Sequence, residues 1–284
     1  MLYKGKIFPA AKNILTIEKR IHRKPKKFLL LSELGLNLEL PIVFLRGSRN
    51  LAKIVEEPSY RERRFIFDDR FHAGRLLAEK LQDYISGEDV VLLAIPDGGV
   101  PVGYMVAKEL GVPMDVIIVR KIQIPWNTEA GFGALTWDGE IVLNEVLIKR
   151  LGLTEKMIQE SILKTQRILR ERVRKFRGDR PMPDLRGRVA VLVDDGLASG
   201  FTMLAAARSI KKKEPRRVIV AVPTASAGAI NLLSDEVDEI FCLNIRSGPV
   251  FAVADAYRNW YDLTDEDVIE ILGRAKIISA DRSS

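Results

Sequence analysis

Short apolar runs alternate with amphipathic segments along the chain from residue 67 onward. The runs are rich in Val, Ile and Leu, which is typical of strands buried on both faces of a parallel sheet. We expect such strands at 90–95, 112–119, 189–193, 217–222 and 239–243. Apolar positions at helical spacing predict helices at 67–85, 104–110, 154–176 and 203–213, in a segment ending near 233, and at 265–272. This alternation predicts an α/β fold with a mainly parallel sheet.

Polar residues mark the starts of three of these helices. Asp68 is expected to be the N-cap of the first helix, Thr154 that of the long polar helix, and Thr264 that of the last helix. Asp69 is expected in the first turn of its helix, where a negative charge complements the helix dipole.

The strand at 189–193 ends in two adjacent carboxylates, Asp194 and Asp195, and leads into a loop of small residues and then a helix. Glycines permit tight turns, and the N–H groups of such a loop and of a helix N-terminus favour an anion. Carboxylates suit instead the hydroxyls of a sugar phosphate or a divalent cation. The alternative is an ordinary turn with solvated acids. The candidate phosphate-binding residues are Gly196, Leu197, Ala198, Ser199, Gly200, Phe201 and Thr202.

A second candidate loop follows the strand at 90–95, where Asp97, Gly98 and Gly99 precede a helix. The glycine pair allows a ligand to approach the backbone closely. The pattern is weak by itself, and a tight strand-to-helix turn explains it equally well.

Arg120 and Lys121 follow the strand at 112–119. Two cations at a strand end suit the binding of pyrophosphate, and the alternative is a solvated basic strand end. The glycine-spaced segment 122–140 has the composition of a mobile loop, and 141–143 is expected to be a strand returning from it. Loops after parallel strands face one crevice, so we expect all these candidates to form a single site.

From about Phe67 to Leu272 the chain resembles a bacterial and archaeal group of type I phosphoribosyltransferases. The acid pair and the Thr-containing loop at 194–202 resemble the signature of the superfamily. The flanking segments that also match are 69–78, 95–107, 119–121, 177–181, 184–203 and 251–261. The resemblance implies a Rossmann-like sheet flanked by helices with a small hood, and a transferase of nucleotide metabolism that uses phosphoribosyl pyrophosphate (PRPP) and Mg²⁺. The resemblance implies that this enzyme releases pyrophosphate when a ring nitrogen of a heterocyclic acceptor displaces the pyrophosphate from the donor.

The resemblance also implies roles for individual residues. Asp194 and Asp195 would bind the ribose hydroxyls or the metal, and the loop at 196–202 the 5′-phosphate. Arg120 and Lys121 would bind pyrophosphate beneath a closing flap at 122–140. In this family the residue before the glycine pair is often basic, so Asp97 is a departure. The expected acceptor pocket is formed by Thr224, Phe251 and Val253, although Phe251 serves equally well as a core residue.

Composition narrows the class of protein. The chain has 284 residues, of which 47% are hydrophobic and 29% charged, as in a soluble globular protein. We expect a cytoplasmic location, since no apolar run is long enough to span a membrane. Cys242 is the only cysteine, which excludes an internal disulfide and a cysteine-rich metal site. A homo-oligomer is also expected.

The positive charge is concentrated at the N-terminus. Residues 1–64 contain 15 Lys/Arg and 6 Asp/Glu, a net charge of +9, whereas the remaining residues carry −2 of the total of +7. We therefore expect an N-terminal extension or small subdomain at 1–64 and a phosphoribosyltransferase-like domain at 65–284. A basic segment can bind nucleic acid, so the alternative function is a regulator that senses PRPP or a nucleotide. Nucleic acid is not the favoured partner.

Overall fold

The computed structural model describes residues 51–280, and within them a six-stranded, fully parallel sheet confirms the predicted α/β class. The strand order is β1-β9-β8-β7-β2-β3. Every residue of β2 and of β7 is buried, as expected of strands rich in Val and Leu that are covered on both faces. The strands are β1 (Lys53–Glu56), β2 (Val90–Ala94), β3 (Met114–Val116), β7 (Val189–Val193), β8 (Arg217–Ser226) and β9 (Glu239–Arg246).

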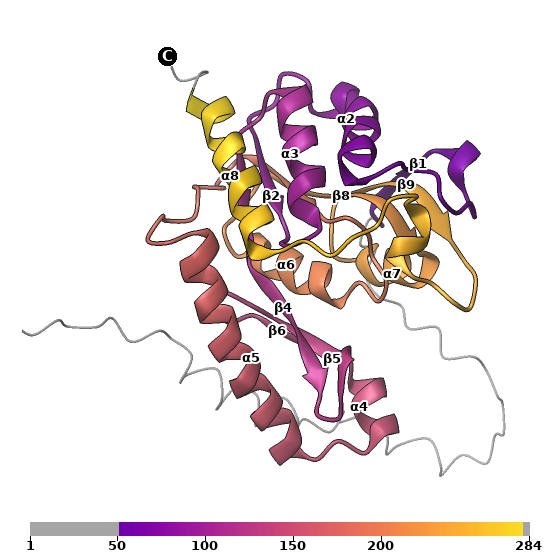
Figure 1. Cartoon of the computed structure of the whole chain (residues 1–284), viewed down its shortest axis with the longest axis vertical. Coiled ribbons are helices and arrows are strands. Elements are labelled where there is room, and N and C mark those ends of the chain that lie inside the picture. Colours follow the sequence, from indigo (N-terminus) through magenta and orange to yellow (C-terminus); the bar gives the residue numbers. More distant parts are fainter. Residues whose placement is uncertain (1–50, 281–284) are drawn as a thin grey trace, which may run out of the picture. The chain divides into compact units, whose positions relative to one another are not determined.

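Helices cover both faces of this sheet (Figure 1). One layer contains α2 (Arg70–Ile85), α3 (Gly99–Leu110) and α8 (Asp265–Ala280), because α3 contacts both of the others. The opposite layer contains α6 (Phe201–Lys211) and α7 (Ala227–Leu233), which also contact each other. Two short 3₁₀ helices, η1 (Pro58–Tyr60) and η2 (Val253–Ala256), contact β9 and β8 respectively.

A second, antiparallel sheet and the two helices that follow it form a unit that we call the hood, residues 119–176. It contains β4 (Val119–Ile124), β5 (Asn127–Thr136) and β6 (Ile141–Leu143), followed by α4 (Glu145–Leu151) and the long α5 (Glu155–Phe176). The strands of the hood contact α6, and α5 contacts β4 and β5. Figure 1 shows the hood as a separate group of elements beside the parallel sheet.

The hood corrects two predictions. The expected strand at 112–119 is divided between β3 of the parallel sheet and β4 of the hood, so Arg120 and Lys121 lie inside β4 and not after a parallel strand. The segment 122–140 is not a loop but mainly a β-hairpin. Gly133 has a packing reason, since a Cβ there would overlap the carbonyl oxygen of Val142 on β6. The strand expected at 141–143 is confirmed.

Most of the predicted helices are present with shifted starts. The first helix begins at Arg70, and its N-cap is Asp69, whose carboxylate accepts a 2.8 Å hydrogen bond from the backbone N–H of His72. Asp68, the expected cap, instead forms a 2.6 Å ion pair with Arg258. The predicted caps Thr154 and Thr264 are confirmed, because each hydroxyl accepts a hydrogen bond from the backbone N–H three residues later.

Other boundaries differ from the predictions in ways that affect the site. α3 begins at Gly99 and α6 at Phe201, so the glycine pair and the end of the candidate phosphate loop belong to helix starts. β8 extends to Ser226, which places Thr224 within a strand.

The N-terminal segment contributes to the parallel sheet. Lys53–Glu56 pairs in parallel with β9 and forms one edge. Residues 1–50, which carry most of the predicted basic segment, lie outside the described residues, so the division at residue 64 stays a prediction. Within residues 51–280, each helix is too short or too polar to cross a bilayer.

Candidate functional site

The loop between β7 and α6 is fixed at the carboxyl end of the sheet. The backbone N–H of Leu197 donates a 2.9 Å hydrogen bond to the carbonyl oxygen of Thr224, and that of Ser226 donates one of the same length to Leu197. The Ser226 hydroxyl donates at 2.6 Å to the carbonyl oxygen of Ala198. These bonds tie the loop to the end of β8 and leave its other side facing a cleft.

Gly200 turns the loop into α6. Its φ of 78° is in the left-handed region that glycine adopts without strain. No side chain of the described residues caps this helix. The N–H groups of its first turn have no acceptor within the helix, and residues 201–203 line the cleft, so this helix start favours an anion.

The two carboxylates after β7 have different surroundings. Asp194 lines the cleft, and one of its carboxylate oxygens accepts a 2.9 Å hydrogen bond from the backbone N–H of Asp195. The carboxylate of Asp195 forms a 2.8 Å ion pair with Arg70. Burial raises the pKa of Asp194 well above its usual range, and the charge of Asp195 raises it further. Burial also raises the pKa of Asp195, but Arg70 opposes that effect.

Arg70 is held on several sides. Its guanidinium donates a 2.8 Å hydrogen bond to the carbonyl oxygen of Tyr261 and lies 3.8 Å from the ring centroid of Trp260. The buried Tyr257 hydroxyl donates at 2.6 Å to the carbonyl oxygen of Asp195. Asp195 is therefore fixed through both its carboxylate and its backbone. Neither Arg70 nor Tyr257 is among the predicted site residues, although both lie in segments that resemble the family.

The loop after β2 packs directly against the acidic pair. A Cβ at Gly98 would overlap the carboxylate of Asp195, and a Cβ at Gly99 would lie 2.6 Å from the carbonyl oxygen of Val193. The glycine pair is thus explained by close packing of two loops from neighbouring strands. The peptide bond between Pro96 and Asp97 in this loop is cis.

The hairpin of the hood forms the opposite wall of the cleft. A cavity of about 460 Å³ separates residues 129–133 of β5 from Asp194 and the loop at 196–203. An adjoining cavity of about 310 Å³ is lined by Arg120, Lys121, Asp194 and Thr202, together with Gln123 and Thr128 of the hairpin. The structure therefore brings the predicted cations, one acid and the predicted phosphate loop to a single cleft.

The two cations of β4 are held differently. The stem of Lys121 lies on Gly131, where a Cβ would overlap it, and its ammonium group donates to the carbonyl oxygen of Glu129. The half-buried guanidinium of Arg120 forms no hydrogen bond or ion pair with the part of the chain that the structure describes. Burial lowers the pKa of Arg120, and the positive charge of Arg172 lowers it further.

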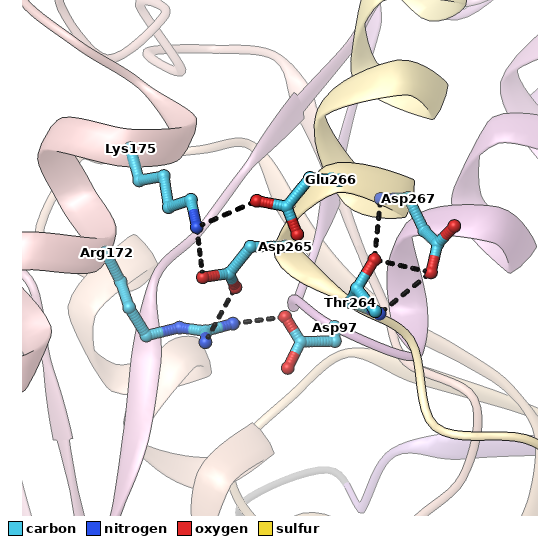
Figure 2. A network of polar contacts seen from close by, with 7 residues as sticks. All are labelled: Asp97, Arg172, Lys175, Thr264, Asp265, Glu266 and Asp267. Carbon is cyan, nitrogen blue, oxygen red and sulfur yellow. Dashed lines mark hydrogen bonds and ion pairs between the residues drawn. The ribbon is translucent and has the colours of Figure 1, made fainter.

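Asp97 takes part in a charged network that joins three elements (Figure 2). Its carboxylate forms an ion pair with Arg172 of α5. Arg172 also lies 3.4 Å from a carboxylate oxygen of Asp265 at the start of α8, and Lys175 forms a 2.6 Å ion pair with that carboxylate.

The expected acceptor residues are only partly assembled. Val253 lines the cleft and packs, with Thr224, against the position that a Cβ of Gly196 would occupy. The Thr224 hydroxyl is buried and has no hydrogen-bond partner among residues 51–280. Phe251 lies away from these cavities, under the guanidinium of Arg246 at 4.8 Å, so its stacking role stays a prediction.

The described residues suit a metal ion only when a bound ligand supplies some of the metal's oxygen ligands. Among residues 51–280 there is no cluster of three or more His, Cys, Asp or Glu side chains that could hold an ion. Mg²⁺ usually retains several waters and uses one or two carboxylates together with phosphate oxygens. Asp194 at the cleft meets that smaller requirement.

Comparisons with known proteins agree on one family. The family model described as "Phosphoribosyl transferase domain" matches residues 68–256. Proteins from two Mycobacterium tuberculosis strains, whose names propose a phosphoribosyl transferase, are 39% identical over 211 residues, or 74% of this chain and 47% of each relative. The chain therefore spans about half the length of the curated relatives it matches. The crystal structure of the protein TT1426 from Thermus thermophilus is 39% identical, with a TM-score of 0.59, over 72% of this chain and 97% of that protein.

Proposed function

Because the chain belongs to the phosphoribosyl transferase domain family, we propose that it transfers the phosphoribosyl group of Mg²⁺-bound PRPP to a heterocycle and releases pyrophosphate. The acceptor is a nucleobase or a related ring nitrogen compound. The observation that carries this proposal is the cleft itself, in which an open helix N-terminus, a carboxylate and two cations surround one space.

The parts of the cleft match the parts of the donor. The loop at 196–202 and the start of α6 would bind the 5′-phosphate with backbone N–H groups and the hydroxyls of Ser199 and Thr202. Asp194 would accept hydrogen bonds from the ribose hydroxyls. Arg120 and Lys121, on the hood side, would bind the pyrophosphate.

Asp195 has a supporting part in this arrangement. Its ion pair with Arg70 and the hydrogen bond from Tyr257 fix the backbone on which Asp194 is carried. Direct binding of the ribose by Asp195, which the sequence suggested, stays a prediction.

The chemistry requires positioning and charge stabilisation more than covalent help from the protein. The bond between C1 of the ribose and the pyrophosphate oxygen breaks, and the ring nitrogen of the acceptor forms the new bond to C1 and gives up its proton, which the released pyrophosphate can accept. Positive charge develops on the ribose and negative charge on the leaving group, which Arg120 and Lys121 would stabilise. Asp194, together with oxygens of the donor, would hold Mg²⁺, which would help to neutralise the leaving group. The hairpin of the hood would exclude water that otherwise hydrolyses the donor.

A pyrophosphate-release assay with PRPP and Mg²⁺, run across purine and pyrimidine bases, tests this function. We expect release that depends on one base or a small class of bases. Binding of PRPP without release for any base would contradict transfer to a nucleobase and favour the sensing alternative.

A further inference from the structure

Three cations from two elements gather near the loop after β2, whose Pro96 lines the cavity of about 310 Å³ together with Arg120. Arg120 lies in β4, and Arg172 and Lys175 lie on α5. Lys175 is neutralised by Asp265, and Arg172 by Asp97 and Asp265. Arg120 alone has no paired group among the described residues. Burial and the positive charge of Arg172 lower its pKa, and the charges of Asp97 and Asp265 act in the opposite direction. Because Asp97 and Asp265 already neutralise Arg172, Arg120 is the cation of this group that is left for an anion in the cavity.

Arg172 retains donors for such an anion. One terminal nitrogen donates to Asp97 and the other to Asp265, which accounts for only part of its five N–H groups. The side chain is 15% exposed, and its guanidinium lies 4.8 Å from the ring centroid of Phe176. Figure 2 shows it between α5 and the two carboxylates. It is therefore fixed in place before any ligand arrives.

We propose that Arg172 binds the pyrophosphate end of the donor together with Arg120, and that Asp97 is the positioning residue that holds Arg172 there. This inference rests on the proposed function. It explains the acid at a position where the family often has a cation, because the chain supplies the cation from α5. The ion pair also connects the hood to the loop after β2, so the hood contributes charge as well as a cover.

Ligands that contain only one end of the donor test this assignment. Calorimetry would measure the affinity of inorganic pyrophosphate with Mg²⁺, of ribose 5-phosphate, and of PRPP with Mg²⁺. The variants are Arg172→Ala, Arg172→Lys, which keeps the charge and most of the packing, and the matched control Arg174→Ala. Arg174 is an exposed arginine two residues further along the same helix.

We expect Arg172→Ala to weaken binding of pyrophosphate and PRPP roughly tenfold to a hundredfold, the range of charge-assisted hydrogen bonds, and to leave ribose 5-phosphate binding unchanged. Arg172→Lys should lose less, and Arg174→Ala nothing. Unchanged pyrophosphate affinity in a folded Arg172→Ala protein would overturn the assignment, as would an equal loss for ribose 5-phosphate, which indicates a displaced hood. A wild-type protein that binds ribose 5-phosphate but not pyrophosphate would overturn the role of Arg172. The assignment of the loop at 196–202 to the 5′-phosphate would then still hold. Binding of none of the three ligands would refute the proposed function and this inference together.

A double-mutant cycle tests the role of Asp97. If Asp97 acts only through Arg172, Asp97→Asn lowers pyrophosphate affinity severalfold in the wild type and has no further effect in Arg172→Ala. The opposite result is equally clear. An Asp97→Asn variant that binds pyrophosphate more tightly would show that Asp97 repels the ligand, and would overturn its positioning role.

Discussion

Replacement of Arg70 by Met should destabilise the protein much more than loss of an exposed ion pair does. The side chains of Arg70 and Asp195 are only 7% and 13% exposed, and their charged atoms are 2.8 Å apart. Removing one partner of a buried pair leaves the other charge uncompensated, which costs about 3–5 kcal/mol. Met retains much of the volume beside Trp260, so the loss reports mainly on charge.

The pH dependence of this loss identifies its cause. Burial raises the pKa of Asp195, and Arg70 is the main charge that opposes the rise. Without Arg70 the folded-state pKa rises further above the unfolded value, so the folded variant holds an extra proton. Its stability deficit is therefore greatest at high pH and shrinks as pH falls toward the ordinary carboxyl pKa.

Urea denaturation followed by circular dichroism at pH 7.5 and pH 5.5 would measure both effects. The control is Arg274→Met, which removes an exposed pair whose partners are 57% and 65% exposed and should cost less than about 1 kcal/mol. Adding Asp195→Asn to Arg70→Met should recover part of the stability. Equal small losses for the two arginines, or a deficit that grows as pH falls, would refute the reasoning.

Three further predictions concern the cleft. Gly99→Ala should lower the free energy of unfolding by about 1–3 kcal/mol, because the added Cβ would lie 2.6 Å from a backbone oxygen of β7. Thermal denaturation measures this loss, and a variant as stable as the wild type would contradict the close packing of Gly99 on β7. Asp194→Asn should stabilise the ligand-free protein at pH 7, since burial raises the pKa of this carboxyl, and urea denaturation should show the gain vanishing as pH falls to about 4. A gain that persists at pH 4 would exclude that cause. Gly131→Ala should displace Lys121 and weaken calorimetrically measured PRPP binding more than ribose 5-phosphate binding, whereas equal losses would argue against contact of Lys121 with pyrophosphate.

The sheet and one wall of the site could be predicted from local sequence. The run at 189–193 forms β7 with the expected boundaries, because a strand covered on both faces needs an unbroken apolar run. The change from Val193 to Asp194 marks where burial decreases and the cleft begins. The small residues after it indicate a loop that backbone groups, and not side chains, must line.

The resemblance implied a small hood, but the residues that form it could not be located in the same way. Glycines usually indicate a loop, but Gly131 and Gly133 lie in the strand β5. These positions require glycine because neighbouring atoms occupy the space that a side chain would fill. The residue pattern along the chain does not show which atoms from other strands will lie beside these glycines. Arg120 and Lys121 were recognised as candidate ligands, but the strand that carries them was misplaced.

Arg172 was missed for a similar reason. On α5 it is one of many charged residues, and its partner Asp97 is 75 positions away in the sequence. Asp97 itself stood out as an unusual residue before the glycine pair. Only the fold shows that this acid is accompanied by an arginine from another element.

Binding of PRPP to the wild type and to Asp194→Asn, titrated by calorimetry with and without Mg²⁺, tests the central claim most directly. We predict saturable binding by the wild type that requires Mg²⁺ and is lost in a folded Asp194→Asn protein. Equal affinity in the two proteins, or no binding by the wild type, would contradict the assignment of this cleft to the donor.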